Sequence, residues 1–362
     1  MAFPGKWTVT QSRWASDKWK LADLLASVRE LLKLLGDRGF KLAPKSPIAT
    51  AVGDLEEMEL YFAGTAPPNF EVDRRPAWRR AIGLADIATK ILAVRTHPDF
   101  QQLEPHFQLL LGNDEISLFT KTEKENDANN KLFELLVGAS AMRFTTDCEI
   151  EPPDFEGASK NPDFIGTWRG KRWAIACKAL HSDNPRAVIQ RIQDGCRQIK
   201  KSGIPNGIIV LNGKNLIPHD DCWPGQKLNG HWHYGAYETI DHVRDIFIEQ
   251  FKTRSAELLH TCSGRDDCES QDELRAALKE GRQNLLAIFA GTNAKPVMPI
   301  VWLTVVGCKT PEAGKVAPAI FRFVNAFAVE ENRCDGETDD FMKLLSLSIQ
   351  NQDPSEENLK RA

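Results

Sequence analysis

From about residue 127 onward, short apolar runs alternate with amphipathic segments, and this pattern predicts an α/β unit. Residues 127–143 are apolar around nearly the whole circumference of a helix, which is typical of a buried helix. Runs rich in β-branched and aromatic residues follow, with one amphipathic segment among them. We assign these runs to a strand at 148–152, a hairpin of 163–168 and 172–179, a helix at 185–202, and a buried strand at 207–212.

Weaker patterns extend on both sides of this unit. Apolar positions at helical spacing predict a mostly helical N-terminal region over residues 1–126. Beyond a long loop at 213–236, two helices and two strands are expected, at 240–259, 272–289, 300–306 and 321–329. The chain is therefore divided into the helical region, a domain at 127–330 (core 127–212, C-terminal extension 213–330), and an acidic, partly mobile tail at 331–362.

The composition limits the classes of function that this chain can have. The 362 residues are 42% hydrophobic and carry a formal net charge of −4, so any contact with nucleic acid requires a local basic patch. The eight cysteines form no CxxC pair, which argues against a zinc ribbon and favours reduced thiols. No apolar signal core and no run long enough to cross a bilayer is present, so we expect a cytoplasmic protein without a membrane partner.

The buried helix carries Glu134 in its middle. A buried carboxylate is costly unless a counter-charge or a metal accompanies it. Lys131 lies three residues earlier and is the simplest counter-charge.

The hairpin carries a second charged pair. A two-residue turn centred between Gly170 and Lys171 would place Asp163 opposite Lys178, on one face. The carboxylate suits a hard cation such as Mg²⁺, and the amine can orient water or stabilise charge on a phosphate. A simple cross-strand ion pair is the alternative.

The segments Asn161-Pro162-Asp163 and Ala176-Cys177-Lys178 resemble the signature of the PD-(D/E)XK nuclease superfamily. That family places a Pro-Asp at the start of one strand, an acid-x-Lys on the next and often a glutamate on the preceding helix. The expected order of elements over residues 127–212 also resembles its restriction-endonuclease-like α-β-β-β-α-β core.

The resemblance implies a metal-dependent nuclease that hydrolyses phosphodiester bonds, with DNA the expected substrate, in restriction, defence or repair. It implies that Glu134, Asp163 and Lys178 are catalytic. It also implies that Mg²⁺ or Mn²⁺ is held by Asp163, Glu134 and the backbone carbonyl of Cys177.

One position departs from the family pattern, because Ala176 stands where the second acid is expected. Three interpretations remain. In the first, the acid is relocated, with Asp194 the first candidate and Asp183 the second, and Gln190 borders the site. In the second, the site works with one metal ion. In the third, the module is catalytically silent and binds nucleic acid or a protein partner. A second Pro-Asp, at Asp154, lies in a loop-like stretch and has no hairpin relation to the lysine.

A local basic patch is expected beside this site. Arg169, Lys171 and Arg172 of the predicted turn and Arg186 and Arg197 of the next helix are the candidates for contacts with phosphates. Assembly into a homo-oligomer or with a protein partner is left open by the sequence.

Overall fold

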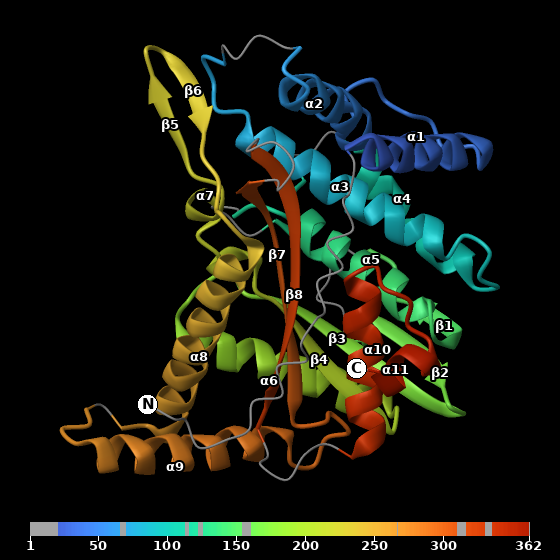
Figure 1. Ribbon diagram of the computed structural model, residues 1–362. Coiled ribbons are helices and arrows are strands. Elements are labelled where there is room, and N and C mark those ends of the chain that lie inside the picture. Colours follow the sequence, from blue (N-terminus) through green and yellow to red (C-terminus); the bar gives the residue numbers. More distant parts are fainter. Residues whose placement is uncertain are drawn as a thin grey trace.

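The computed structural model is an α/β structure built around a mixed six-stranded sheet, as expected (Figure 1). It describes residues 21–65, 70–112, 116–121, 126–153, 161–265, 267–309, 316–329 and 335–361. The sheet has the order β1-β2-β3-β4-β7-β8; β3, β4 and β7 are parallel to one another, and the remaining pairs are antiparallel. Its strands are β1 (Thr146–Ile150), β2 (Phe164–Trp168), β3 (Lys171–Ala179), β4 (Asn206–Asn212), β7 (Val297–Lys309) and β8 (Val316–Ala328).

Helices cover both faces of the sheet (Figure 1). They are α1 (Leu21–Asp37), α2 (Pro47–Phe62), α3 (Arg75–Ala93), α4 (Glu104–Leu111), α5 (Asp127–Met142), α6 (Pro185–Ser202), α7 (His219–Cys222), α8 (Ile240–Ser263), α9 (Gln271–Phe289), α10 (Gly336–Ile349) and α11 (Glu356–Arg361), with short 3₁₀ helices η1 (Phe100–Leu103) and η2 (Lys214–Leu216). Among the described residues, none of these helices combines the length and the apolar character needed to cross a bilayer.

One continuous apolar cluster joins the N-terminal helices to one face of the sheet. It includes Trp78 of α3, Phe133 of α5 and Trp173 of β3, so the core continues across the boundary that the sequence suggested at residue 126. Phe341 of α10 belongs to the same cluster and stacks on Trp173, with ring centroids 4.3 Å apart. Within the predicted tail at 331–362, residues 336–349 and 356–361 form the helices α10 and α11, and both helices contribute buried side chains to this cluster.

Helix α6 packs on the opposite face of the sheet, together with α8 and α9. Asn184 caps its N-terminus by accepting a hydrogen bond from a backbone N–H, and Gly203, with φ of 70°, ends it. At Gly195 a β-carbon would lie 3.0 Å from the side chain of Ile209. The absence of a side chain there brings α6 close to β4, behind the candidate site.

The turn between β2 and β3 consists of Arg169 and Gly170, whose φ values are 47° and 70°. Two successive positive φ values match the type I′ turn that suits a two-residue hairpin. The ladder accordingly pairs Trp168 with Lys171. The turn centre lies one residue earlier than the sequence analysis placed it.

This turn changes the predicted register. Phe164 pairs with Ile175, so the expected pairing of Asp163 with Lys178 is wrong by two residues. An even shift leaves each side chain on its expected face, whereas an odd shift would have moved it to the other face. The hairpin therefore still brings the aspartate and the lysine to one end of the sheet.

The loop expected at 213–236 contains regular structure. Besides η2 and α7 it holds a second sheet of β5 (Gly225–Leu228) and β6 (His231–Tyr234). Asn229 and Gly230 form its turn with φ values of 50° and 86°. Asn-Gly is the strongest short-range hairpin signal in a sequence, and it was overlooked.

Candidate active site

Asp163 lies where β2 and β3 separate. Its N–H donates to the carbonyl of Ile175 at 3.0 Å, and its carboxylate Oδ2 accepts the N–H of Cys177 at 2.6 Å. The side chain thus takes the place of a backbone acceptor at the end of the ladder. Only 3% of the residue is exposed, so the carboxylate is both buried and held in one orientation.

Lys178 is next to this carboxylate. Its Nζ lies 3.9 Å from Asp163 Oδ2 and donates to the Cys177 carbonyl at 3.0 Å. The pair is therefore an ion pair at the limit of direct contact, with the amine anchored by its own strand. The Cys177 carbonyl, expected to hold a metal, accepts this lysine.

Glu134 reaches the same place from α5. Lys131 Nζ donates to its Oε2 at 2.8 Å, so the local ion pair that the sequence allowed does form. Burial raises the pKa of the Glu134 carboxyl to about 8, and the negative charge of Asp163 is the next cause. The three residues that the sequence singled out therefore lie within electrostatic reach of one another.

The two carboxyls of Asp163 and Glu134 lie in a poorly solvated place with two amines. Burial raises the pKa of Asp163, while the charges of Lys178 and Lys131 and the Cys177 N–H oppose that shift. Each additional negative charge in such a place is costly unless a cation enters. A divalent cation would favour the ionised form of both carboxyls.

A third carboxylate was missed by the sequence analysis. Glu151 directly follows β1, and its N–H donates to the Asp163 carbonyl at 3.1 Å. Asn161 Nδ2 lies 3.2 Å from each of its carboxylate oxygens. The negative charge of Glu151 raises the pKa of Asp163. The pairing of β1 with β2 would have been needed to find it, because Ile150 faces Phe164.

The position at which the nuclease pattern has its second acid is buried among apolar side chains. Ala176 is fully buried and belongs to the apolar cluster under α6. Asp194, the candidate for a relocated acid, interacts with Gln190 and Arg197 of its own helix, and Asp183 with Arg254 of α8. Among the described residues, the structure shows no contact of Asp194 with the Asp163 cluster. The alternative Pro-Asp aspartate, Asp154, lies outside the described residues.

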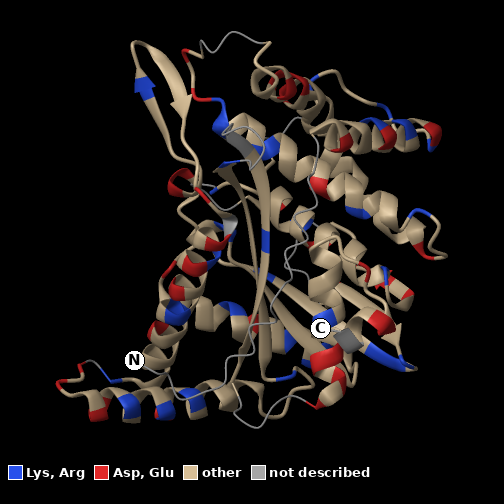
Figure 2. Cartoon of the chain, viewed as in Figure 1, with Lys and Arg blue, Asp and Glu red and all other residues tan. Residues whose placement is uncertain are grey.

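The expected basic patch is not assembled at this site. Arg169 pairs with acids of α10 and α11, Lys171 with Glu337 of α10, and Arg172 with Glu149 of β1. Figure 2 shows the basic turn beside the acidic stretches of these helices. At about 3.3 Å per residue, the turn end of β3 lies roughly 23 Å from the lysine at its other end.

The helix residues proposed for phosphate contacts behave differently from each other. Arg186 is exposed in the first turn of α6, whereas Arg197 pairs with Asp194. Arg186 and Arg197 are both exposed, but only Arg186 lies at the end of the helix that follows β3.

Comparison of the chain with family models, with curated proteins and with solved structures found no match.

Proposed function

We propose that this chain is a metal-dependent nuclease of the PD-(D/E)XK type, with DNA the expected substrate. One observation carries the proposal: Asp163, Glu134 and Lys178 come from three separate elements and converge in one buried place. The order α5-β1-β2-β3-α6-β4 supports it, as does the strand order β1-β2-β3-β4 with β3 and β4 parallel. Within this α/β fold, we interpret residues 127–212 as a restriction-endonuclease-like core.

The donor set fits a hard divalent cation. Asp163 and Glu134 offer carboxylate oxygens, and Glu151, which follows β1, adds a third. Mg²⁺ and Mn²⁺ prefer oxygen ligands. When bound, such an ion supplies positive charge that stabilises charge developing on a phosphate. Glu151 occupies the role that the absent acid at Ala176 leaves open.

The chain's own groups would act as follows. The Cys177 N–H holds the Asp163 carboxylate in one orientation, which lowers the cost of arranging ligands. Lys178 is anchored near that carboxylate and can donate to the attacking water or to a phosphate oxygen. Lys131 donates a hydrogen bond to Glu134 and can release that carboxyl to a cation.

A catalytically silent module that binds nucleic acid or a protein partner is the second candidate. The observation that favours it is the internal pairing of the cluster. Lys131 pairs with Glu134 and Lys178 with Asp163, so both carboxyls already have an amine beside them. With the acid absent at Ala176, this arrangement needs no cation to be stable.

The deciding experiment compares cleavage of DNA by the full chain with Mg²⁺, with Mn²⁺ and with chelator. We expect cutting only with divalent metal, and we expect Lys178→Ala to abolish it while the circular dichroism spectrum is unchanged. Lys171→Ala is the matched control, because this lysine lies at the far end of the same strand and pairs with Glu337. Wild-type protein that binds DNA but never cuts it would leave the silent module as the function.

A further inference from the structure

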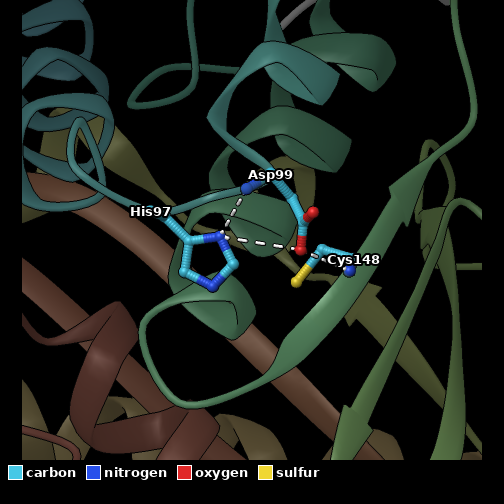
Figure 3. A group of neighbouring side chains, drawn as sticks. All are labelled: His97, Asp99 and Cys148. Carbon is cyan, nitrogen blue, oxygen red and sulfur yellow. Dashed lines mark hydrogen bonds and ion pairs between the residues drawn. The ribbon is translucent and has the colours of Figure 1, made fainter.

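A second group of metal-ligating side chains lies where the loop after α3 meets the start of β1 (Figure 3). His97 and Asp99 come from that loop, and Cys148 comes from β1. One ligand atom of each residue, a ring nitrogen, a carboxylate oxygen and the sulfur, lies within 4.8 Å of the other two. Histidine, cysteine and aspartate are the residues that bind Zn²⁺ in proteins.

Two hydrogen bonds determine which tautomer of the His97 imidazole is present. Nε2 lies 2.9 Å from the carbonyl oxygen of Thr145, so Nε2 carries the proton. Nδ1 accepts the N–H of Asp99 at 3.1 Å and therefore has a lone pair. A metal-binding histidine commonly donates its other ring N–H to a backbone carbonyl in this way.

His97 Nδ1 also lies near the carboxylate of Asp99. Nδ1 and Oδ2 are 3.8 Å apart, which is too long for a hydrogen bond. With metal–ligand bonds of 2.0–2.3 Å, tetrahedral geometry places ligand atoms about 3.3–3.7 Å apart. A cation between these two atoms would take the Nδ1 lone pair that accepts the Asp99 N–H, so its binding would break that hydrogen bond.

The backbone of β1 presents Cys148 to the same place. The register with β2 shifts between Thr146 and Glu149, and Asp147 has φ of 49°, so β1 contains a bulge here. The Cys148 N–H donates to Asp99 Oδ2 at 2.8 Å. Bulges commonly re-aim side chains beside functional sites, and this one brings the thiol to the carboxylate.

The thiol of Cys148 is protonated when no metal is bound. Thr145 Oγ1 donates to the Ala141 carbonyl at 2.9 Å, so at its 3.3 Å contact with the sulfur it accepts the thiol proton. Burial raises the pKa of Cys148 to about 11. Binding of a cation would break the S–H bond, form a metal–sulfur bond and release one proton to solvent.

We propose that His97, Asp99 and Cys148 bind a borderline-soft divalent cation of the Zn²⁺ class, with water as the fourth ligand. This site is separate from the carboxylate site at Asp163, and its nitrogen and sulfur ligands select against Mg²⁺. The bound ion ties the connection between α3 and α4 to β1, and the two segments already meet through the Thr145 and Asp99 hydrogen bonds.

Co²⁺ is the probe, because a cobalt–thiolate bond gives a charge-transfer absorption in the near ultraviolet. We expect this band when the full chain is titrated with Co²⁺, its loss on addition of Zn²⁺ and its persistence in excess Mg²⁺. Cys148→Ser should remove the band, and Asp99→Asn should weaken Co²⁺ binding by about tenfold. Cys196→Ser is the matched control, since Cys196 is another buried thiol, on α6.

Two further variants make the assignment unambiguous. Asp163→Asn should keep the band, because the site does not depend on the proposed nuclease centre. Cys177→Ser should also keep it, although Cys177 lies beside that centre. Absence of the band in wild-type protein, its survival in Cys148→Ser, or its loss in Cys177→Ser would each overturn the proposal. His97→Ala, which leaves the buried thiol intact, decides the question if the cysteine variant does not fold by circular dichroism.

Discussion

The backbone N–H of Glu151 donates to the carbonyl oxygen of Asp163, so β1 ends beside the candidate active site. Glu151 therefore lies beside Asp163 on the side of β1. The nuclease pattern has its second acid on the other neighbouring strand, β3, at the position of Ala176. Asn161 contacts both oxygens of Glu151 and restricts its orientation. The site has three carboxylates in spite of Ala176.

Replacing Glu151 by glutamine tests whether this carboxylate holds metal. Glu151→Gln should weaken Mn²⁺ binding by about tenfold, equivalent to about 1.4 kcal/mol, because one charged ligand is lost. Isothermal titration calorimetry measures the change. Glu149→Gln is the control, because Glu149 lies two residues earlier in the chain, on β1, and pairs with Arg172. Equal weakening in both variants would mean that the negative surface, and not Glu151 as a ligand, attracts the ion.

Asp163→Asn should remove the thermal stabilisation by metal. A ligand at one hundred times its dissociation constant stabilises the folded state by about 2.7 kcal/mol. For a chain of 362 residues this corresponds to a rise in Tm of roughly 3–4 °C. Asparagine keeps an acceptor for the Cys177 N–H, so the variant should stay folded and show no metal-dependent shift by scanning calorimetry. A shift as large as that of wild-type protein would place the metal elsewhere.

The raised pKa of Glu134 predicts a definite pH dependence. Its folded-state pKa of about 8 exceeds its value of 4.5 in the unfolded chain. The folded state therefore binds more protons between these values, and the stabilisation is lost as pH rises through 8. Glu134→Gln cannot ionise, so its free energy of unfolding relative to wild type should increase from pH 5 to pH 8.5 by about 1–3 kcal/mol. Urea denaturation without divalent metal measures this difference; a constant difference would contradict the assignment.

Two substitutions separate the interpretations of the absent acid. Asp194→Asn should leave Mn²⁺ affinity unchanged, because Asp194 interacts with Gln190 and Arg197 on its own helix. Ala176→Glu should lower the free energy of unfolding by several kcal/mol, because it buries a carboxylate under α6. Millimolar Mg²⁺ should restore part of that loss if the new carboxylate reaches the ion. A marked loss of Mn²⁺ affinity in Asp194→Asn would establish the relocated acid instead.

Local patterns in the sequence were enough to predict the central elements. The apolar circumference of α5, the β-type runs of β2, β3 and β4 and the amphipathic face of α6 all depend on neighbouring residues in the chain. These elements were predictable because burial on one face or all faces of an element imposes a short-range repeat. Asp163 and Lys178 were indicated by the expected hairpin and by the resemblance of their segments to a nuclease signature.

Only the tertiary structure decided the rest, because it depends on contacts between distant segments. The positive φ angles of Arg169 and Gly170 determine the hairpin register, and the pairing of β1 with β2 brings Glu151 to Asp163. The acidic helices that neutralise the basic turn lie more than 160 residues away from it in sequence. Their packing depends on Phe341, which stacks on Trp173. No local repeat encodes such partners. The basic residues that were predicted to form a binding patch therefore pair, in the fold, with acidic residues of the predicted tail.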